Sequence, residues 1–511
     1  MKKTALIIMM ITIISKIFGF TRDIFLSFFF GASNISDAYI ISLTIPMTLF
    51  TFLGVAISTS YIPLYSDISN RDNIEKADKF TANLTNLLMI ICTLMIVTGI
   101  IFTEEIVKVF AAGFQGETLS LAILFTRISL FGIYFSVLTA VFKSYLQIKN
   151  NYIIPALIGL PYNIISIIAM ALASNYDLAF LSYGTVIAIG SQVLLLLPFV
   201  LKNGYKHKLN FDFRNKHINR LVHLSIPIMF GISINQINVL VDKTIASSVS
   251  VGGISALSYA NRLNWFVQGI IVTSIATVIY PTISKMAVNK EIDNLKKVLQ
   301  KSMVSVVLLI IPATIGSIIF SEPIIKLLFG RGAFDDKAIK MTSQALIFYS
   351  VGMLGFGFRE VLSRVFYAFQ DTRTPMVNAG FGMVLNIILN IILSKYLGIG
   401  GLALATSLAA IVTTILMILS LRKKIQGFGM KKVGISLIKV LISSVLMGFI
   451  SKYVYKYSLP VFNDTISLFF AIFIGVVTYG GVLSLFKIEE IDEILRNIKN
   501  KSKNIISKLK R

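Results

Sequence analysis

Long apolar runs separated by short polar segments repeat along the whole chain. Each run approaches or exceeds the ~20 residues that a helix needs to cross a hydrocarbon core of roughly 30 Å. Lipid cannot satisfy backbone polar groups, so these runs must be helices, and their continuous apolarity argues against a β-barrel, whose strands alternate. We expect about fourteen transmembrane segments, at 4–30, 35–66, 80–102, 119–147, 152–173, 178–201, 219–248, 253–284, 300–320, 341–369, 374–396, 399–421, 433–455 and 464–486.

The charges in the polar loops indicate a topology. Alternate loops are basic, most clearly 202–220, which has six Lys or Arg residues against one acid, whereas the loops between them are short, acidic or mixed. Because Lys and Arg accumulate on the cytoplasmic side of a membrane, we expect both termini to be cytoplasmic.

The longest polar loop follows the sixth segment and divides the chain into two halves. Paired halves are typical of transporters, whose substrate site lies near the bilayer midplane between them. The basic tail, with Ile and Leu at helical spacing, is expected to lie on the anionic inner leaflet. The expected organisation is an N-terminal lobe at 1–201, a basic cytoplasmic loop at 202–218, a C-terminal lobe at 219–424, two further helices at 425–486 and an amphipathic cytoplasmic tail at 487–511.

The composition excludes several classes of protein. Only 14% of the 511 residues are charged, against about 25% in a soluble domain. The net charge of +24 is explained by cytoplasmic loops rather than by nucleic-acid binding. A single cysteine, Cys92, cannot form an intramolecular disulfide. The sequence has no phosphate-binding Gly-x-x-x-x-Gly-Lys-[Ser/Thr] loop and no set of catalytic side chains, so we expect no ATP hydrolysis and no enzyme activity.

Charged residues inside the apolar runs are the first candidate site. Such a charge costs about 2.5–3.5 kcal/mol at the centre of a membrane helix, so it should face a cavity or a partner. For Arg22 and Arg262 there are two interpretations: each binds an anion, or each only forms an ion pair that holds helices together. Asp23 is expected to be a poor ion-pair partner for Arg22, because adjacent residues on a helix do not face each other. Three cations against two acids suit an anionic substrate, because Arg binds phosphate with two hydrogen bonds. The candidates are Lys16, Arg22 and Asp23 in the first segment, Asp37 in the second and Arg262 in the eighth.

A second candidate cluster is rich in neutral oxygen atoms. Asp242 lies in the seventh segment, Asn386 and Asn390 lie four residues apart on one face of the eleventh, and Thr406 lies in the twelfth. Their side chains could bind a small hard cation such as Na⁺. They could equally form the hydrogen bonds that join helices in membrane bundles. Both interpretations stay open at this point.

Four motifs resemble one family of membrane proteins. They are Ser15–Asp23 (SKIFGFTRD), Ser36–Tyr39 (SDAY), Ser258–Leu263 (SYANRL) and Ser363–Pro375 (SRVFYAFQDTRTP). Together they are similar to the MurJ (MviN) lipid II flippases of the multidrug/oligosaccharidyl-lipid/polysaccharide exporter superfamily, and the similarity runs over nearly the whole chain.

The resemblance implies a fold and a set of site residues. The family packs two six-helix lobes around a cationic central cavity, and its last two helices form a groove for a polyprenyl tail. By motif, Arg22 and Arg262 match the essential cavity arginines, and Asp23 and Asp37 match their acidic partners. Lys16 stands where the family usually has Arg. The set of Asp242, Asn386, Asn390, Thr406 and the carbonyl of Leu402 matches a sodium site of the family.

The implied activity is that of a monomeric lipid II flippase in the bacterial cytoplasmic membrane. It would move lipid-linked peptidoglycan precursor to the outer leaflet by alternating access, driven by membrane potential or a cation gradient, with no cofactor besides a coupling Na⁺. Two departures from the family stand out: no Arg pair or Glu follows Pro46, and Asn261 replaces a common Asp. The alternatives are therefore a flippase for another polyprenyl-linked oligosaccharide and a cation-coupled drug exporter.

Overall fold

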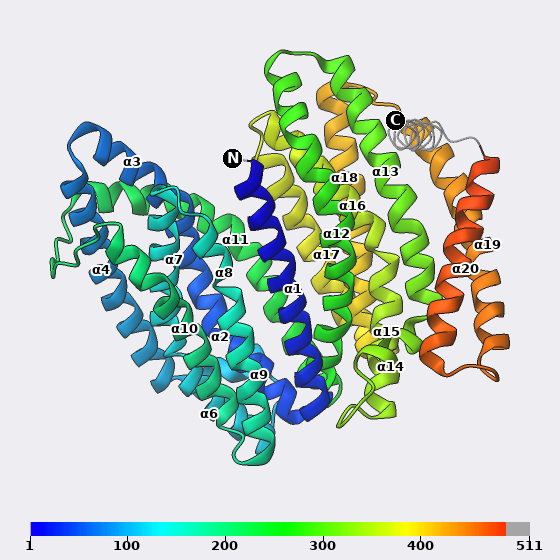
Figure 1. Cartoon of the computed structure of the whole chain (residues 1–511), viewed down its shortest axis with the longest axis horizontal. Helices are drawn as coiled ribbons and strands as arrows, with labels where there is room; N and C mark the ends of the chain where they lie inside the picture. Colours follow the sequence, from blue (N-terminus) through cyan, green and yellow to red (C-terminus); the bar gives the residue numbers. More distant parts are fainter. Residues whose placement is uncertain (1, 487–511) are drawn as a thin grey trace, which may run out of the picture. The chain divides into compact units, whose positions relative to one another are not determined.

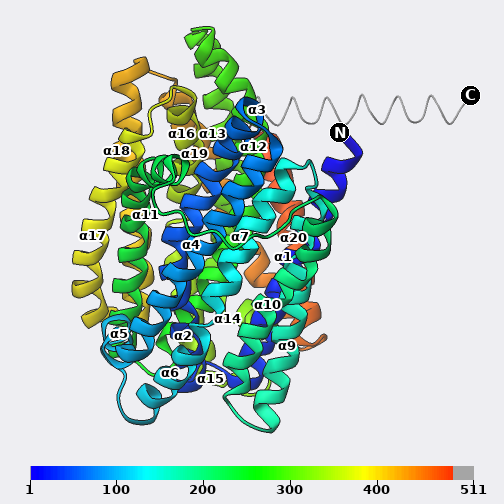
Figure 2. The same cartoon turned by 90° about the vertical axis from the view of Figure 1, so that its left-hand side faces the viewer.

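The computed structural model describes residues 2–486, and every regular element in that part of the chain is a helix (Figures 1 and 2). The all-α membrane fold expected from the apolar runs is confirmed. The amphipathic tail expected at 487–511 lies outside the described residues.

Among the described helices, ten are long and apolar enough to cross a membrane, or up to thirteen if each bent pair is one span. These thirteen correspond to the expected segments from 35–66 onward. The first expected segment falls in α1 (Lys2–Phe30), a helix of 29 residues that is not among the thirteen. The exact count of fourteen is therefore not confirmed.

The chain folds into two compact units. Unit 1 comprises the residues up to Ala256 together with Phe329–Ala338. Its helices after α1 are α2 (Asn34–Ala56), the π-helical turn η1 (Ile57–Tyr61), α3 (Ile62–Arg71), α4 (Ile74–Ile101), α5 (Thr103–Phe110), α6 (Gly116–Ser129), α7 (Gly132–Ile148), α8 (Ile153–Leu157), α9 (Gly159–Asn175), α10 (Phe180–Lys202) and α11 (Lys216–Val249).

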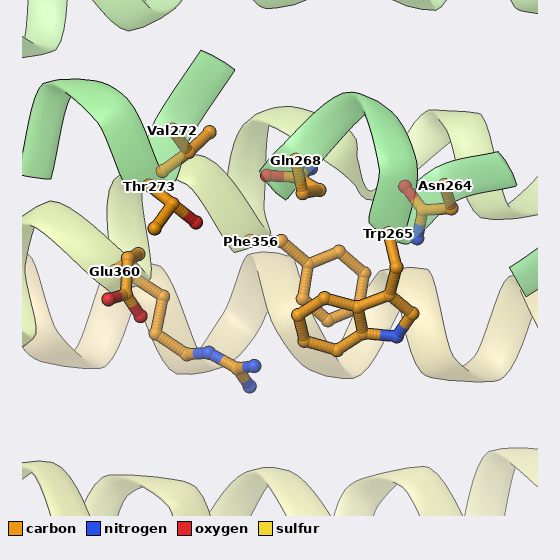
Figure 3. Close-up of a pocket in the computed structure, with 8 residues that line it drawn as sticks. Asn264, Trp265, Gln268, Val272, Thr273, Phe356 and Glu360 are labelled. Carbon is orange, nitrogen blue, oxygen red and sulfur yellow. The ribbon is translucent and has the colours of Figure 1, made fainter. Parts of the chain in front are cut away.

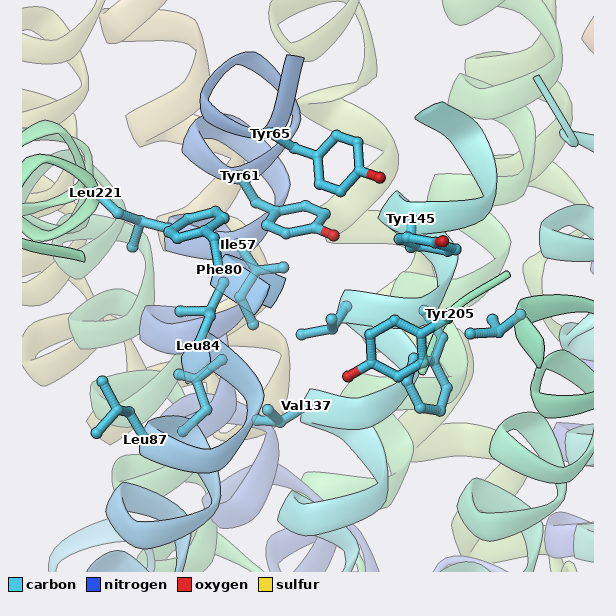
Figure 4. Close-up of a cluster of buried hydrophobic side chains, with 14 of the residues drawn as sticks. Ile57, Tyr61, Tyr65, Phe80, Leu84, Leu87, Val137, Tyr145, Tyr205 and Leu221 are labelled. Carbon is cyan, nitrogen blue, oxygen red and sulfur yellow. The ribbon is translucent and has the colours of Figure 1, made fainter. Parts of the chain in front are cut away.

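The core of unit 1 is an aromatic and aliphatic cluster around α3, α4 and α7 (Figure 4). The hydroxyl groups of its buried tyrosines form hydrogen bonds, as buried polar groups generally do. The hydroxyl of Tyr61 lies 2.8 Å from Thr81 Oγ1, and the hydroxyl of Tyr65 donates to Asp78 Oδ1 at 2.8 Å. These bonds fix η1 and the short α3 against α4.

Unit 2 comprises Leu257–Leu328 and the described residues from Ile339 onward. Its core joins α13 to α16 and α18, and the last two helices pack side by side (Figure 1). Its helices are α12 (Gly253–Val288), whose first turn belongs to unit 1, α13 (Ile292–Ile319), α14 (Ser321–Leu328), α15 (Asp336–Val351), α16 (Met353–Ala368), α17 (Arg373–Leu397), α18 (Ile399–Ile425), α19 (Met430–Ser458) and α20 (Asp464–Leu485).

Three apolar segments are bent by more than 40°, and one of the bends has a visible cause. In α11 the bend is 56° and falls between Ile226 and Gly231. At the 46° bend between α15 and α16, a Cβ at Gly352 would lie only 2.6 Å from Ser407 Oγ, so α18 approaches closely there. Ser407 Oγ donates to the Phe348 carbonyl at 2.6 Å, replacing a helical hydrogen bond.

Contacts group the helices differently from their order along the chain. Helix α11 was expected in the C-terminal lobe at 219–424, but it packs on α2 and α5 and groups with unit 1. Residues 329–338 also group with unit 1, where the Ala333 amide donates to the Phe28 carbonyl at 2.8 Å. The lobe boundaries inferred from segment order remain a prediction.

Candidate functional site

The first candidate cations lie on α1, which packs closely on α9 in unit 1. Small residues make this approach possible: a Cβ at Gly159 would lie 3.1 Å from Ser15 Oγ, and a Cβ at Gly19 would lie 3.8 Å from the Asn163 amide. The close packing brings the Arg22 guanidinium over the Tyr162 ring, with Cζ 5.5 Å from the ring centroid. This is a cation–π distance, so Arg22 is held against α9.

Arg22 also forms an ion pair with its neighbour Asp23. Arg22 Nη2 and Nε donate to Asp23 Oδ1 at 2.8 and 3.2 Å, and the two side chains are only 15% and 10% exposed. The expectation that Asp23 is a poor partner for Arg22 was wrong. Adjacent residues do point in different directions on a helix, but the long Arg side chain bends back far enough to reach the carboxylate.

Asp37 is 1% exposed and lies at the N-terminus of α12. Its Oδ2 accepts from the Gly252 amide at 2.8 Å, and its Oδ1 accepts from the Ser255 amide at 2.7 Å and from the Ser255 hydroxyl. The first amide groups of a helix lack partners within the helix and carry partial positive charge, so a carboxylate there is stabilising. Asp37 therefore anchors the start of α12, a contact across 218 residues of sequence.

The two remaining candidate cations are exposed, and they belong to different units. Lys16 lies on α1 in unit 1, and Arg262 lies on α12 in unit 2. That Lys16, Arg22 and Arg262 share one cavity, with Asp23 and Asp37 as their partners, stays a prediction.

Four of the five residues of the candidate sodium site come together in unit 2. Asn390 Nδ2 donates to Asn386 Oδ1 at 2.9 Å, and Asn386 Nδ2 donates to Thr406 Oγ1 at 3.3 Å. Thr406 Oγ1 donates to the Leu402 carbonyl at 3.0 Å. This chain of neutral groups joins α17 to α18. Asp242 lies on α11 in unit 1, so its place in the same site stays a prediction.

Residues 2–486 contain no group of three or more His, Cys, Asp or Glu side chains that could hold a metal ion. A sodium ion would have to rely on amide, hydroxyl and carbonyl oxygens, which hard cations accept as ligands. Asn386, Asn390, Thr406 and Leu402 offer such oxygens, although hydrogen bonds now join them to one another.

Arg359 is an intramembrane cation that the sequence analysis did not single out. Arg359 lies in the interior of α16, and its Cζ is 5.1 Å from the Phe356 ring centroid. The signal that could have found it was the one that pointed to Arg262, namely a charge well inside an apolar run.

Known structures define the class of protein to which this fold belongs. An inward-facing multidrug resistance transporter of the MATE family covers 82% of this chain with a TM-score of 0.69 at 16% identity, a likeness in fold alone. A structure of the lipid II flippase MurJ in an inward closed conformation covers 94% of this chain and 98% of its own, with a TM-score of 0.81 at 30% identity. The fold is that of a polytopic membrane transporter.

The family follows from the sequence. The family model described as lipid II flippase MurJ matches residues 26–474. The probable lipid II flippase MurJ of Thermotoga maritima is 30% identical over 95% of this chain and 96% of its own length. The lipid II flippase MurJ of Thermosipho africanus is 31% identical over 93% and 94%. The chain belongs to the MurJ family, whose members are transporters rather than catalysts, and the resemblance seen in its motifs is confirmed.

Proposed function

We propose that this chain moves lipid II, the undecaprenyl-pyrophosphate-linked peptidoglycan precursor, from the inner to the outer leaflet of the bacterial cytoplasmic membrane. The observation that carries the proposal is the family match over residues 26–474. The protein acts as a monomer by alternating access, with both termini in the cytoplasm.

Pyrophosphate binding is assigned to Arg22, Arg262 and Lys16. A guanidinium has five N–H donors, and Asp23 takes only two from Arg22, both on one oxygen. The other donors can bind a phosphate oxygen while Asp23 keeps the side chain in place. Charge-assisted hydrogen bonds of this kind are about twice as strong as neutral ones. The bound pyrophosphate neutralises the positive charges of these side chains, and this permits the protein to change from the inward-open to the outward-open state.

The return step is driven by membrane potential, a cation gradient or both. A potential supplies about 2.3 kcal/mol per charge per 100 mV, enough to bias a cavity with excess positive charge. Sodium is assigned to Asp242, Asn386, Asn390, Thr406 and the carbonyl of Leu402. Hydrogen bonds that already hold four of these residues together support the assignment.

Complementation tests this function. A bacterium depleted of its own lipid II flippase would express wild type, Arg22→Ala or Arg262→Ala, each checked for its level in the membrane. We expect growth with wild type and none with either alanine variant, whereas the exposed control Lys297→Gln should rescue fully. No rescue by well-expressed wild type would point to another polyprenyl-linked oligosaccharide. Rescue by both alanine variants would refute the role of the arginines.

The orientation can be tested with single cysteines. In a Cys92→Ser background, Tyr176→Cys and Leu209→Cys are a matched pair, since the native side chains are 79% and 80% exposed. An impermeant maleimide should label position 176 in intact spheroplasts and position 209 only after lysis. The reverse pattern would overturn the assignment of cytoplasmic termini.

A further inference from the structure

Unit 2 contains a pocket that none of the roles assigned above uses. It has a volume of about 60 Å³ and lies between α12 and α16 (Figure 3). This is well below the roughly 300–1,000 Å³ of a site for a drug-sized ligand, so the pocket fits the end of a larger molecule rather than the whole of one. Its lining residues are Asn264, Trp265, Gln268, Val272, Thr273, Phe356, Arg359 and Glu360.

Arg359 gives this pocket a positive charge. Within residues 2–486 no carboxylate lies within 4.0 Å of its guanidinium, and no side chain or carbonyl accepts a hydrogen bond from it. Glu360 also lines the pocket, but Arg364 neutralises it with an ion pair of 2.6 Å. A cation inside an apolar segment is expected to face a partner or a ligand.

Two amide side chains supply hydrogen-bond acceptors. Asn264 is 2% exposed, and its Oδ1 accepts no hydrogen bond in the described part of the chain. Gln268 Nε2 donates to the Met353 carbonyl at 2.8 Å, which fixes the amide so that Oε1 remains an acceptor. A buried acceptor without a donor is costly, so such a group in a pocket points to a ligand that carries a hydrogen-bond donor, such as an amide N–H.

The third wall is aromatic. The rings of Trp265 and Phe356 lie next to each other with centroids 6.5 Å apart, and Trp265 is 58% exposed (Figure 3). They present an apolar surface beside the charge of Arg359. Trp265 also follows Arg262 by three residues on α12, so the two exposed side chains are neighbours on that helix.

We propose that this pocket binds the terminal carboxylate and adjacent amide N–H of a peptide. An ionised phosphate ester has no hydrogen-bond donor for the oxygens of Asn264 and Gln268, whereas a peptide terminus offers the carboxylate, an N–H donor and a small apolar side chain together. The inference rests on the proposed function and deepens it, since it assigns the peptide of the lipid II headgroup to α12 and α16, beside Arg262.

Trp265 is the single tryptophan of the chain, so its fluorescence reports on this pocket alone. Full-length protein in lipid nanodiscs would be titrated with N-acetyl-alanyl-alanine, with the C-terminal amide of the same dipeptide, and with N-acetylglucosamine. For so small a fragment we expect saturable binding of the acid in about the millimolar range. The amide should bind at least about tenfold more weakly, because it loses a charge-assisted hydrogen bond.

Variants separate a binding role from a structural one. Arg359→Gln should abolish the response to the acid, Arg359→Lys should retain part of it, and the surface control Lys297→Gln should leave it unchanged. Asn264→Leu should weaken binding severalfold without lowering the melting temperature, because the replaced acceptor lacks a donor in the free protein.

Equal binding of acid and amide, or an unchanged response in Arg359→Gln, would overturn the inference. So would a matching response to N-acetylglucosamine, since the pocket would then select an acetamido group. If wild type complements in cells but binds no dipeptide, the inference alone fails. If wild type is expressed and does not complement, the proposed function itself fails.

Discussion

Asp37 in unit 1 and Arg359 in unit 2 are both charges within apolar segments, but their surroundings differ. Asp37 is 1% exposed, and both its oxygens accept hydrogen bonds from the start of α12. Arg359 lies against an aromatic ring with no carboxylate within 4.0 Å among the described residues. Hydrogen bonds within the protein therefore compensate the charge of Asp37, whereas we propose a ligand as the partner of Arg359.

This difference separates charges that stabilise the fold from charges that are available for binding. The oxygens of Asp37 accept hydrogen bonds from backbone amides, so this carboxylate is held at the start of a helix. A guanidinium without an acid keeps its donors for a ligand. The same distinction applies to Arg22, which shares one oxygen of Asp23 and retains further N–H groups.

The largest effect is expected from Asp37→Ala. The substitution leaves the amides of Gly252 and Ser255 without their acceptor in a buried place, and we expect a loss of roughly 3–5 kcal/mol in stability. Thermal unfolding of purified protein, with size-exclusion chromatography as the readout of folded protein, would measure this loss. The control is Asp335→Ala, which removes an exposed carboxylate that caps α15 through the Ala338 amide at 2.8 Å and should cost about 1 kcal/mol. Equal losses in both variants would contradict the comparison.

Arg359→Met should change the stability in the opposite direction from Asp37→Ala. It replaces a half-buried cation, which has no carboxylate within 4.0 Å in the described chain, with an apolar side chain of similar length, and we expect a gain of about 1 kcal/mol. The melting temperature should rise while transport falls. A lower melting temperature would mean that Arg359 is structural, and the contrast with Asp37 would disappear.

A smaller loss of stability than for Asp37→Ala is expected when the neutral cluster on α17 and α18 is changed. Asn390→Leu removes a buried hydrogen bond of 2.9 Å and should cost about 1 kcal/mol whatever its role. If the cluster binds sodium, NaCl should raise the melting temperature of wild type relative to choline chloride, and the variant should lose that increment. Equal melting temperatures in the two salts would leave only the interhelical role.

The smallest effect is expected from Asp371 in the loop before α17. Partial burial alone would raise the pKa of Asp371, but hydrogen bonds from Lys424 and Thr374 outweigh it and lower the pKa to about 2. The folded state therefore keeps this carboxylate ionised where the unfolded chain, with a pKa of 3.8, binds a proton. Its contribution is complete above pH ~4 and is lost as the pH falls towards 2.

Melting curves across this range, compared with Asp371→Asn, would measure that contribution. Because the pair with Lys424 is partly exposed, we expect less than about 1 kcal/mol. A variant that melts like wild type at every pH would show that the ion pair contributes nothing.

The sequence by itself determined the membrane class, most of the spans and the family. Helix-forming apolar length and the cost of an intramembrane charge are local properties, so they can be read without a fold. The same reasoning singled out Arg22, Asp37 and Arg262, and it would have singled out Arg359 had it been applied to every apolar run. The motif resemblance rested on short contiguous stretches, which is why it needed no tertiary information.

Only the tertiary structure decided which partner each charge has. The anchoring of α12 by Asp37 joins residues more than 200 positions apart, and no local pattern encodes it. The pairing of Arg22 with Asp23 depended on side-chain bending rather than on helix geometry. The grouping of α11 with unit 1, and the pocket between α12 and α16, followed from packing of distant helices. The local sequence determines where a charge is unfavourable, whereas the fold determines which hydrogen bonds and ion pairs compensate it.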